Sequence, residues 1–141
     1  MGLTRDSFSD LAVRVATGAV IAVVGLTAVW AGGWWFTGLV AVLVATLVWE
    51  LVRMLGGGGR GALALAALAA VAILATKLAP LAVALGCVLA VPTVAMALLA
   101  RNRRLFVVMI AVILLAGFGL ILHRDSFGLM WMLWLVLVVA A

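Results

Sequence analysis

The sequence is poor in residues that can ionise. Only four of its 141 residues are acidic, one is His and one is Cys, and both Tyr and Gln are absent. Charged residues make up 9% of the chain, against about 25% in typical soluble domains. Hydrophobic residues make up 70%, and a domain of this size cannot hide so many of them from water. This composition excludes a soluble enzyme and a nucleic-acid-binding module, and it predicts an integral membrane protein.

The single Cys and the single His exclude two further kinds of site. Cys87 cannot form a disulfide within the chain, and in its apolar run it is expected to pack as a small hydrophobic residue. His123 has no Cys or acidic cluster around it, so it cannot build a zinc site. We expect it to be a solvated loop residue. Motif analysis finds no catalytic residue, no bound cofactor and no credible Ser–His–Asp set.

The apolar runs predict membrane-spanning helices. Residues 15–49 carry no charge, and as one helix they would be about 52 Å long against a hydrocarbon core of about 30 Å. The run must therefore turn, and Gly32 and Gly33, flanked by Trp side chains that favour the interface, mark the turn. The predicted fold class is all-α, a polytopic transmembrane helix bundle of about six spans, at residues 12–31, 34–54, 61–77, 80–100, 105–122 and 127–141.

Polar or glycine-rich segments are predicted to connect these spans. Residues 56–59 are four glycines without the Lys and Ser or Thr of a phosphate-binding loop, so they are interpreted as a flexible turn. Residues 123–126 are predicted to form a polar loop. The span at 127–141 is open-ended, because no polar flank closes it. We therefore expect residues 1–141 to be a truncated chain or a fragment of a longer protein.

The basic residues predict the orientation of the spans. With the predicted topology, seven of the nine Lys and Arg residues fall on one side of the membrane and only Lys77 and Arg124 fall on the other. Short loops rich in Lys and Arg stay in the cytoplasm. The N-terminus is therefore predicted to be cytoplasmic.

Among the four acidic residues, Glu50 is the most informative. It lies near the cytoplasmic end of the second predicted span, where Arg53 three residues later can reach it. One interpretation is that the two residues form an interfacial ion pair that holds the end of the span. The other is that they are weak candidates for substrate binding and contact a lipid phosphate or a catalytic loop. Asp6 and Asp10 either belong to an amphipathic entry helix or share a metal on one helix face. Asp125, beside Arg124, is expected to cap a helix or to form an ion pair.

The chain resembles the N-terminal half of bacterial phosphatidate cytidylyltransferase, also called CDP-diacylglycerol synthase. The resemblance rests on Arg14-Val15 at the start of the first span, a Trp-Ala-Gly-Gly-Trp turn at residues 30–34, and Val-Trp-Glu-Leu at residues 48–51. The apolar, Trp-containing segment at residues 128–140 is similar to the family's span before its first catalytic segment. The family's Asp-x-Gly-Ala-Tyr-like segment and its later Lys/Asp-rich signature are absent from this sequence.

The resemblance implies a membrane nucleotidyltransferase of phospholipid biosynthesis in the bacterial inner membrane. Its full-length reaction uses phosphatidic acid and CTP, forms CDP-diacylglycerol and pyrophosphate, and needs Mg²⁺. None of the residues present is implied to bind that ion, and this chain alone is expected to be inactive. A homo-oligomer is compatible with the sequence. The alternatives are a small multi-span transporter or channel subunit and a non-catalytic membrane assembly protein.

Overall fold

The computed structural model describes residues 5–54, 59–98 and 103–140. These residues form five helices and are connected, where described, by short turns. The helices are α1 (Arg5–Ala31), α2 (Gly33–Met54), α3 (Gly59–Ala75), α4 (Leu81–Leu98) and α5 (Arg103–Ala140). The predicted turn at residues 56–59 and the connection at 101–104, between the predicted spans 80–100 and 105–122, lie partly outside the described residues. Gly59 already belongs to α3, and Arg103 and Arg104 already belong to α5.

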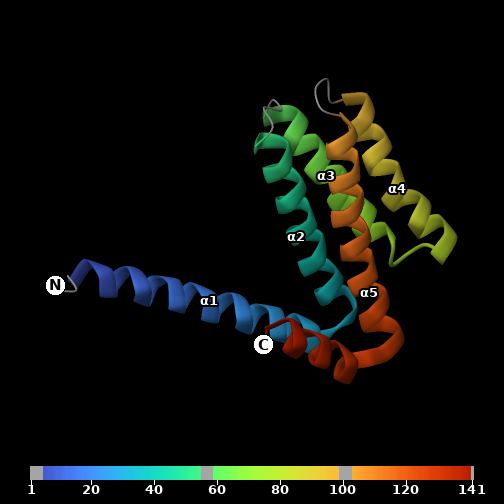
Figure 1. The fold of residues 1–141 in the computed structure, drawn as a ribbon. Helices are drawn as coiled ribbons and strands as arrows, with labels where there is room; N and C mark the ends of the chain where they lie inside the picture. Colours follow the sequence, from blue (N-terminus) through green and yellow to red (C-terminus); the bar gives the residue numbers. More distant parts are fainter. Residues whose placement is uncertain (1–4, 55–58, 99–102, 141) are drawn as a thin grey trace.

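Four of the helices pack side by side into an antiparallel bundle. Figure 1 shows α2, α3, α4 and the first arm of α5 running up and down alongside one another. Helix α5 bends at Gly128, whose backbone angles are φ 81° and ψ −171°, and its second arm then crosses the lower end of the bundle (Figure 1). Helix α1 also extends across that end and leaves the bundle, so the whole molecule has the outline of an L.

The turn between α1 and α2 has the conformation that its glycines allow. Gly32 and Gly33 have φ values of +62° and +51°, a region that other residues rarely adopt. The Gly32 amide donates a hydrogen bond to the carbonyl of Ala28 at 2.9 Å, and the Phe36 amide donates to the Gly32 carbonyl at 3.2 Å. The predicted turn at this position is confirmed.

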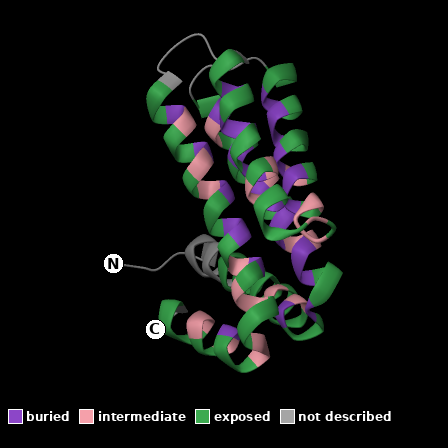
Figure 2. Ribbon diagram, turned by 90° about the vertical axis from the view of Figure 1, so that its right-hand side faces the viewer, coloured by how far each residue is buried: buried purple, intermediate pink, exposed green. Residues whose placement is uncertain are grey.

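The core of the bundle is built from small and medium-sized side chains. Val40, Val44 and Val48 recur every four residues along α2 and are buried, which places them on one helix face. They belong to the same buried cluster as several alanines of α3. Figure 2 shows such buried stripes facing the bundle interior while the outer faces are exposed. Lipid tails provide no hydrophobic drive between helices, so close approach of small residues is what stabilises such contacts.

Gly117 marks the closest approach of α5 to its neighbours. A Cβ atom built on Gly117 would lie 2.7 Å from Cγ2 of Val44 and 3.3 Å from Cγ1 of Val40, both on α2, and 3.5 Å from Cδ1 of Ile73 on α3. Two residues along the same helix, a Cβ on Gly119 would meet no atom within 4 Å. The absence of a side chain at Gly117 therefore lets α5 sit against both α2 and α3.

Within the described residues, three helical segments are long and apolar enough to cross a membrane: Val13–Ala31, Gly33–Met54 and Arg104–Val139. Helices α3 and α4 are apolar but shorter, and the six predicted spans are not confirmed. The predicted polar loop at residues 123–126 is wrong, because these residues continue α5 as helix. Helix α5 bends after this segment, at Gly128. The polar side chains of residues 124 and 125 have partners elsewhere in the bundle, which allows the segment to be helical.

Gly117→Ala is expected to destabilise the bundle by about 1–3 kcal/mol, because the added methyl group overpacks the contact with Val44. Gly119→Ala is the matched control. It should be neutral or slightly stabilising, since Ala is the better helix former and the space is open. Unfolding in mixed micelles, followed by circular dichroism, measures both. Equal stability of the two variants would contradict the close approach at Gly117.

Candidate functional site: a cationic bundle end

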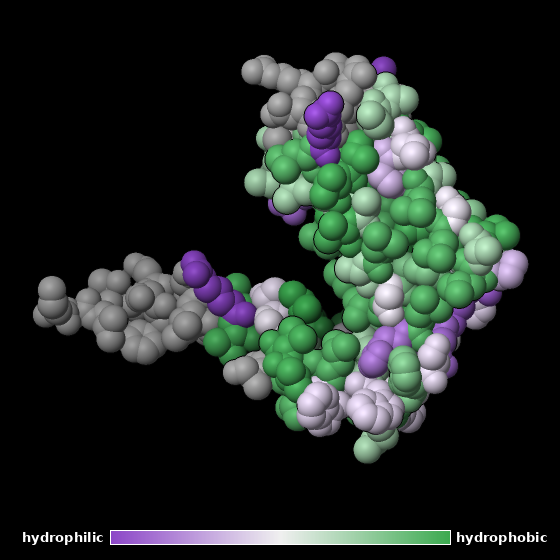
Figure 3. Space-filling view, turned by 45° about the vertical axis from the view of Figure 1, so that its right-hand side comes forward, coloured by the Kyte–Doolittle hydropathy of each residue, from purple (hydrophilic) through white to green (hydrophobic). Residues whose placement is uncertain are grey.

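The polar side chains of the bundle gather at its two ends. Arg53 at the end of α2, Arg60 at the start of α3 and Arg104 at the start of α5 lie at the upper end in Figure 1 and are exposed. Lys77 and Arg124 lie towards the opposite end. For these five residues, the predicted separation of basic side chains into two groups holds in the folded bundle. The apolar middle, visible as the broad hydrophobic surface in Figure 3, separates the two polar ends.

At the cationic end, Arg53 stacks on an aromatic ring. Its Cζ atom lies 4.8 Å from the ring centroid of Trp49, four residues earlier on α2. An Arg–Trp contact of this length is a cation–π interaction. Glu50, Trp49, Arg53 and Met54 together line a shallow, open cleft of about 290 Å³. Helical spacing brings these side chains to one place, because positions three and four apart share a face.

The ion pair expected between Glu50 and Arg53 does not form. An ion pair that does form joins Lys77 and Asp125, at the other end of the bundle. The guanidinium of Arg53 turns to Trp49 instead, since cation–π contact with an indole face competes with an exposed salt bridge that gains little in water. The two candidate binding residues are therefore neighbours in one cleft and are not bound to each other.

This arrangement suits recognition of an anionic group. Arg53 is exposed, and a guanidinium can donate two parallel hydrogen bonds to a phosphate. The cleft is shallow and lined partly by polar side chains, as expected at the boundary between headgroups and hydrocarbon. It offers a binding contact. It contains no nucleophile beside a base, so it does not offer bond-breaking chemistry.

The opposite end is held together by contacts between distant parts of the chain. Lys77, in the turn after α3, forms an ion pair with Asp125 on α5. Arg124 donates from Nε to the carbonyl of Val29 at 2.9 Å and from Nη2 to the carbonyl of Trp30 at 3.5 Å. The last carbonyls of a helix lack partners within the helix and carry its negative dipole end. Arg124 therefore caps α1 from another helix.

These contacts explain why residues 123–126 are helical. Asp125 forms an ion pair, as predicted, and its partner is Lys77. The predicted solvated loop position of His123 is wrong, because its Nε2 atom is buried without a hydrogen-bond partner and its ring packs 5.0 Å from that of Phe127. The role of Arg124 was missed. The sequence offered one signal for it. Arg124 is one of only two basic residues that the predicted topology places on the side of the membrane opposite to the other seven.

The described side chains do not assemble a metal site. No group of three His, Cys, Asp or Glu side chains comes together among them. Glu50 and Asp125 belong to opposite ends of the bundle, and Asp125 already pairs with Lys77. Asp6 and Asp10 lie in α1, but their side chains are outside the described part of the structure. Cys87 is half-buried on α4, close to the expected packing role.

Comparison with known proteins adds one finding. A family model described as "Cytidylyltransferase family" matches residues 12–141. Neither the curated proteins nor the solved structures contain a match to the chain. The matched region includes all of the bundle and the described side chains of α1.

Arg124→Leu is expected to lower the free energy of unfolding by about 1–2 kcal/mol, because the carbonyls at the end of α1 lose a charged donor. Arg104→Leu, at an exposed position on the same helix, is the control and should change stability by less than about 0.5 kcal/mol. Unfolding in mixed micelles measures both variants. If Arg124→Leu were as stable as the control, the capping role would be refuted.

Proposed function

The chain belongs to the cytidylyltransferase family, and from this membership we propose that it forms the N-terminal membrane part of a phosphatidate cytidylyltransferase. The enzyme would transfer CMP from CTP to phosphatidic acid in phospholipid biosynthesis. The match over residues 12–141 carries the proposal. The apolar helices and the resemblance of residues 30–34 and 48–51 to the bacterial enzymes support the lipid substrate and the bacterial inner membrane as the location.

The proposed reaction is a single substitution at phosphorus. A phosphate oxygen of phosphatidic acid attacks the α-phosphorus of CTP and forms a new P–O bond. The bond from the α-phosphorus to the oxygen that bridges to the β-phosphorus breaks, and pyrophosphate leaves with that oxygen. The products are CDP-diacylglycerol and pyrophosphate. Positioning of two anionic reactants is the main task of a protein in such a reaction.

In this proposal, residues 1–141 hold the lipid and other segments of the full enzyme handle the nucleotide. Arg53 would donate hydrogen bonds to the phosphate of phosphatidic acid from its seat on Trp49. Glu50, beside it in the cleft, would accept a hydrogen bond from a protonated phosphate oxygen or contact a catalytic loop. The excess of basic residues at this end favours the cytoplasmic side of the membrane, where CTP is available, and a cytoplasmic N-terminus.

Magnesium is not assigned to the described side chains. The resemblance implies Mg²⁺ for the full-length enzyme, but Glu50 is the only acidic side chain at the cationic end among the described residues, and Mg²⁺ prefers several oxygen ligands. We propose that the ion is held by catalytic segments that this sequence lacks. No step is therefore assigned to it through residues 1–141.

Binding of phosphatidic acid tests the role of Arg53. The chain in lipid nanodiscs should bind a fluorescent phosphatidic acid, and Arg53→Gln should weaken binding about fivefold, since one interfacial charge is worth about 1 kcal/mol. Lys77→Gln, at the other end, is the matched control and should leave the affinity unchanged. Equal effects of the two variants would contradict a site at Arg53.

Turnover tests the assignment of the chemistry. Residues 1–141 in detergent or lipid are expected to form no CDP-diacylglycerol from phosphatidic acid, CTP and Mg²⁺, because they contain no catalytic set. Labelled CTP and thin-layer separation of lipids measure the product. Synthesis by this chain alone would contradict the proposal that segments outside residues 1–141 carry out the chemistry. If a longer product of the same reading frame used CTP on a different acceptor, the proposed substrate would be wrong.

A further inference from the structure

Helix α1 is far more exposed than the rest of the fold. Of its apolar segment Val13–Ala31, only 6% is buried. Val13 and Ile21 are 64% and 66% exposed, and most side chains between them are exposed as well. Figure 1 shows why: α1 leaves the bundle and touches it only near its C-terminal end. Nineteen consecutive residues of this kind require a hydrocarbon environment or a protein partner.

The sequence of α1 does not suit a helix that lies along a membrane surface. Such helices carry a charged face opposite an apolar one. After Arg14 the segment has no charged residue. The hydroxyl groups of Thr17 and Thr27 donate to carbonyls of their own helix, those of Val13 and Val23, at 2.8 Å. No side of α1 beyond Arg14 is therefore polar enough to face water.

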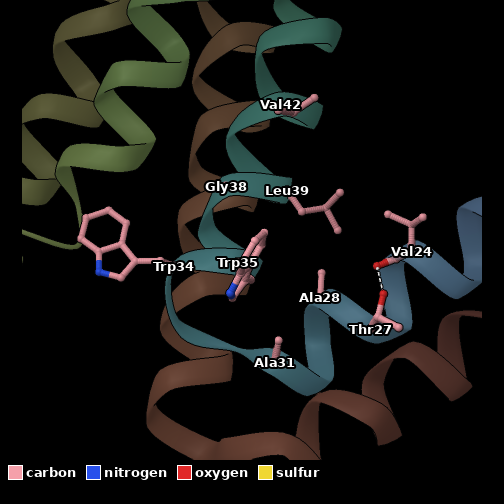
Figure 4. A pocket seen from close by; sticks show the side chains of 9 residues that line it. All are labelled: Val24, Thr27, Ala28, Ala31, Trp34, Trp35, Gly38, Leu39 and Val42. Carbon is pink, nitrogen blue, oxygen red and sulfur yellow. Dashed lines mark hydrogen bonds between the residues drawn. The ribbon is translucent and has the colours of Figure 1, made fainter.

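An apolar groove lies in the angle between α1 and α2. Its volume is about 580 Å³. Figure 4 shows α1 and α2 as its two walls, with Val24 and Ala28 of α1 opposite Gly38 and Leu39 of α2. Other lining residues include Trp35 and Val42, further up α2. The lining positions follow helical spacing on both helices, and continuing that spacing leads to Val20 on α1 and Thr46 on α2, both exposed.

The connection between the two walls allows them to move. Gly32 is confined, because a Cβ there would lie 2.8 Å from Nη2 of Arg124. Gly33, also at positive φ, has no atom within 4 Å of such a Cβ. Glycine samples positive and negative φ with nearly equal ease, so other torsions at Gly33 would set a different angle between α1 and α2. Arg124 reaches α1 at residues next to this point and can follow through its flexible side chain.

We propose that in a bilayer α1 closes about Gly33 onto α2, so that the two walls of the groove become the interface of an antiparallel helical hairpin. Before closure, α1 is exposed and lies across the end of the bundle. After closure, its axis runs alongside the bundle axis. All nineteen residues of Val13–Ala31 then lie at the depth of the hydrocarbon core. At 1.5 Å per residue the segment is about 28 Å long, close to the core thickness of about 30 Å.

The charges support the same position independently. In the open arrangement, Arg14 is far along α1 and away from the cationic bundle end (Figure 1). An antiparallel hairpin carries the N-terminal part of α1 up beside the C-terminal part of α2, which brings Arg14 to the end that holds Arg53 and Arg60. Concentration of basic residues on one side is the pattern that membrane insertion favours.

Disulfide trapping tests the closure. The double variant Val20→Cys and Thr46→Cys, in a Cys87→Ala background, places thiols on the two facing walls far from the turn. After reconstitution in lipid and mild oxidation, we expect most chains to form a disulfide within one chain, so that both thiols become unreactive to a maleimide of high mass. The matched control is Ala22→Cys with Thr46→Cys, because residue 22 lies on the opposite face of α1. It should remain reactive.

Two outcomes would overturn the proposal. If neither pair forms a disulfide, α1 stays open in the membrane. If the Val20 and Thr46 pair forms only disulfides between chains, seen as a band of twice the mass, α1 fills the groove of a second copy instead.

Labelling from one side of the membrane provides a second test that needs no pair of thiols. Three single-Cys variants in the Cys87→Ala background are compared: Val13→Cys, Arg60→Cys at the cationic end, and Leu78→Cys at the other end. Closure predicts that a membrane-impermeant thiol reagent labels Val13→Cys from the same side as Arg60→Cys. Labelling from the side of Leu78→Cys would contradict it.

Discussion

The fold depends on close helix contact in a setting where lipid gives helices no hydrophobic reason to associate. Helices in a bilayer are held by van der Waals packing of small residues and by polar contacts. Gly117 supplies the first, because it lets α5 touch Val44 of α2 and Ile73 of α3. Arg124 and the Lys77–Asp125 pair supply the second at one end of the bundle. The opposite end is left exposed and cationic, and it is there that the proposed lipid contact lies.

Much of the fold could be predicted from the sequence, because apolar run length and glycine position are local signals. Helices α2, α3 and α4 begin and end within a few residues of the predicted spans at 34–54, 61–77 and 80–100. The turn at Gly32 and Gly33 is where two glycines between Trp residues indicated it. The helical state of residues 123–126 could not be predicted, since Asp125 pairs with Lys77 and Arg124 donates to the carbonyl of Val29, which lie 48 and 95 residues away in the sequence. The direction of α1 depends on one glycine torsion, which no periodicity encodes.

The candidate site was predictable in its residues but not in its geometry. The position of Glu50 near Arg53 at a span end follows from spacing alone. The sequence does not say whether an arginine chooses a carboxylate three residues back or an indole four residues back, because both are within reach on one helix face. The structure has Arg53 on Trp49, which leaves the Glu50 carboxylate free of it in the cleft where we propose that a lipid phosphate binds.

The central claim is that this member of the cytidylyltransferase family contributes, in residues 1–141, a membrane bundle that handles lipid and not nucleotide. Equilibrium binding of labelled CTP to the chain in nanodiscs, with and without Mg²⁺, tests it most directly. The account predicts no saturable CTP binding in either condition, since it assigns the nucleotide to segments of the full enzyme outside residues 1–141. Saturable binding that prefers CTP over other nucleoside triphosphates would contradict it.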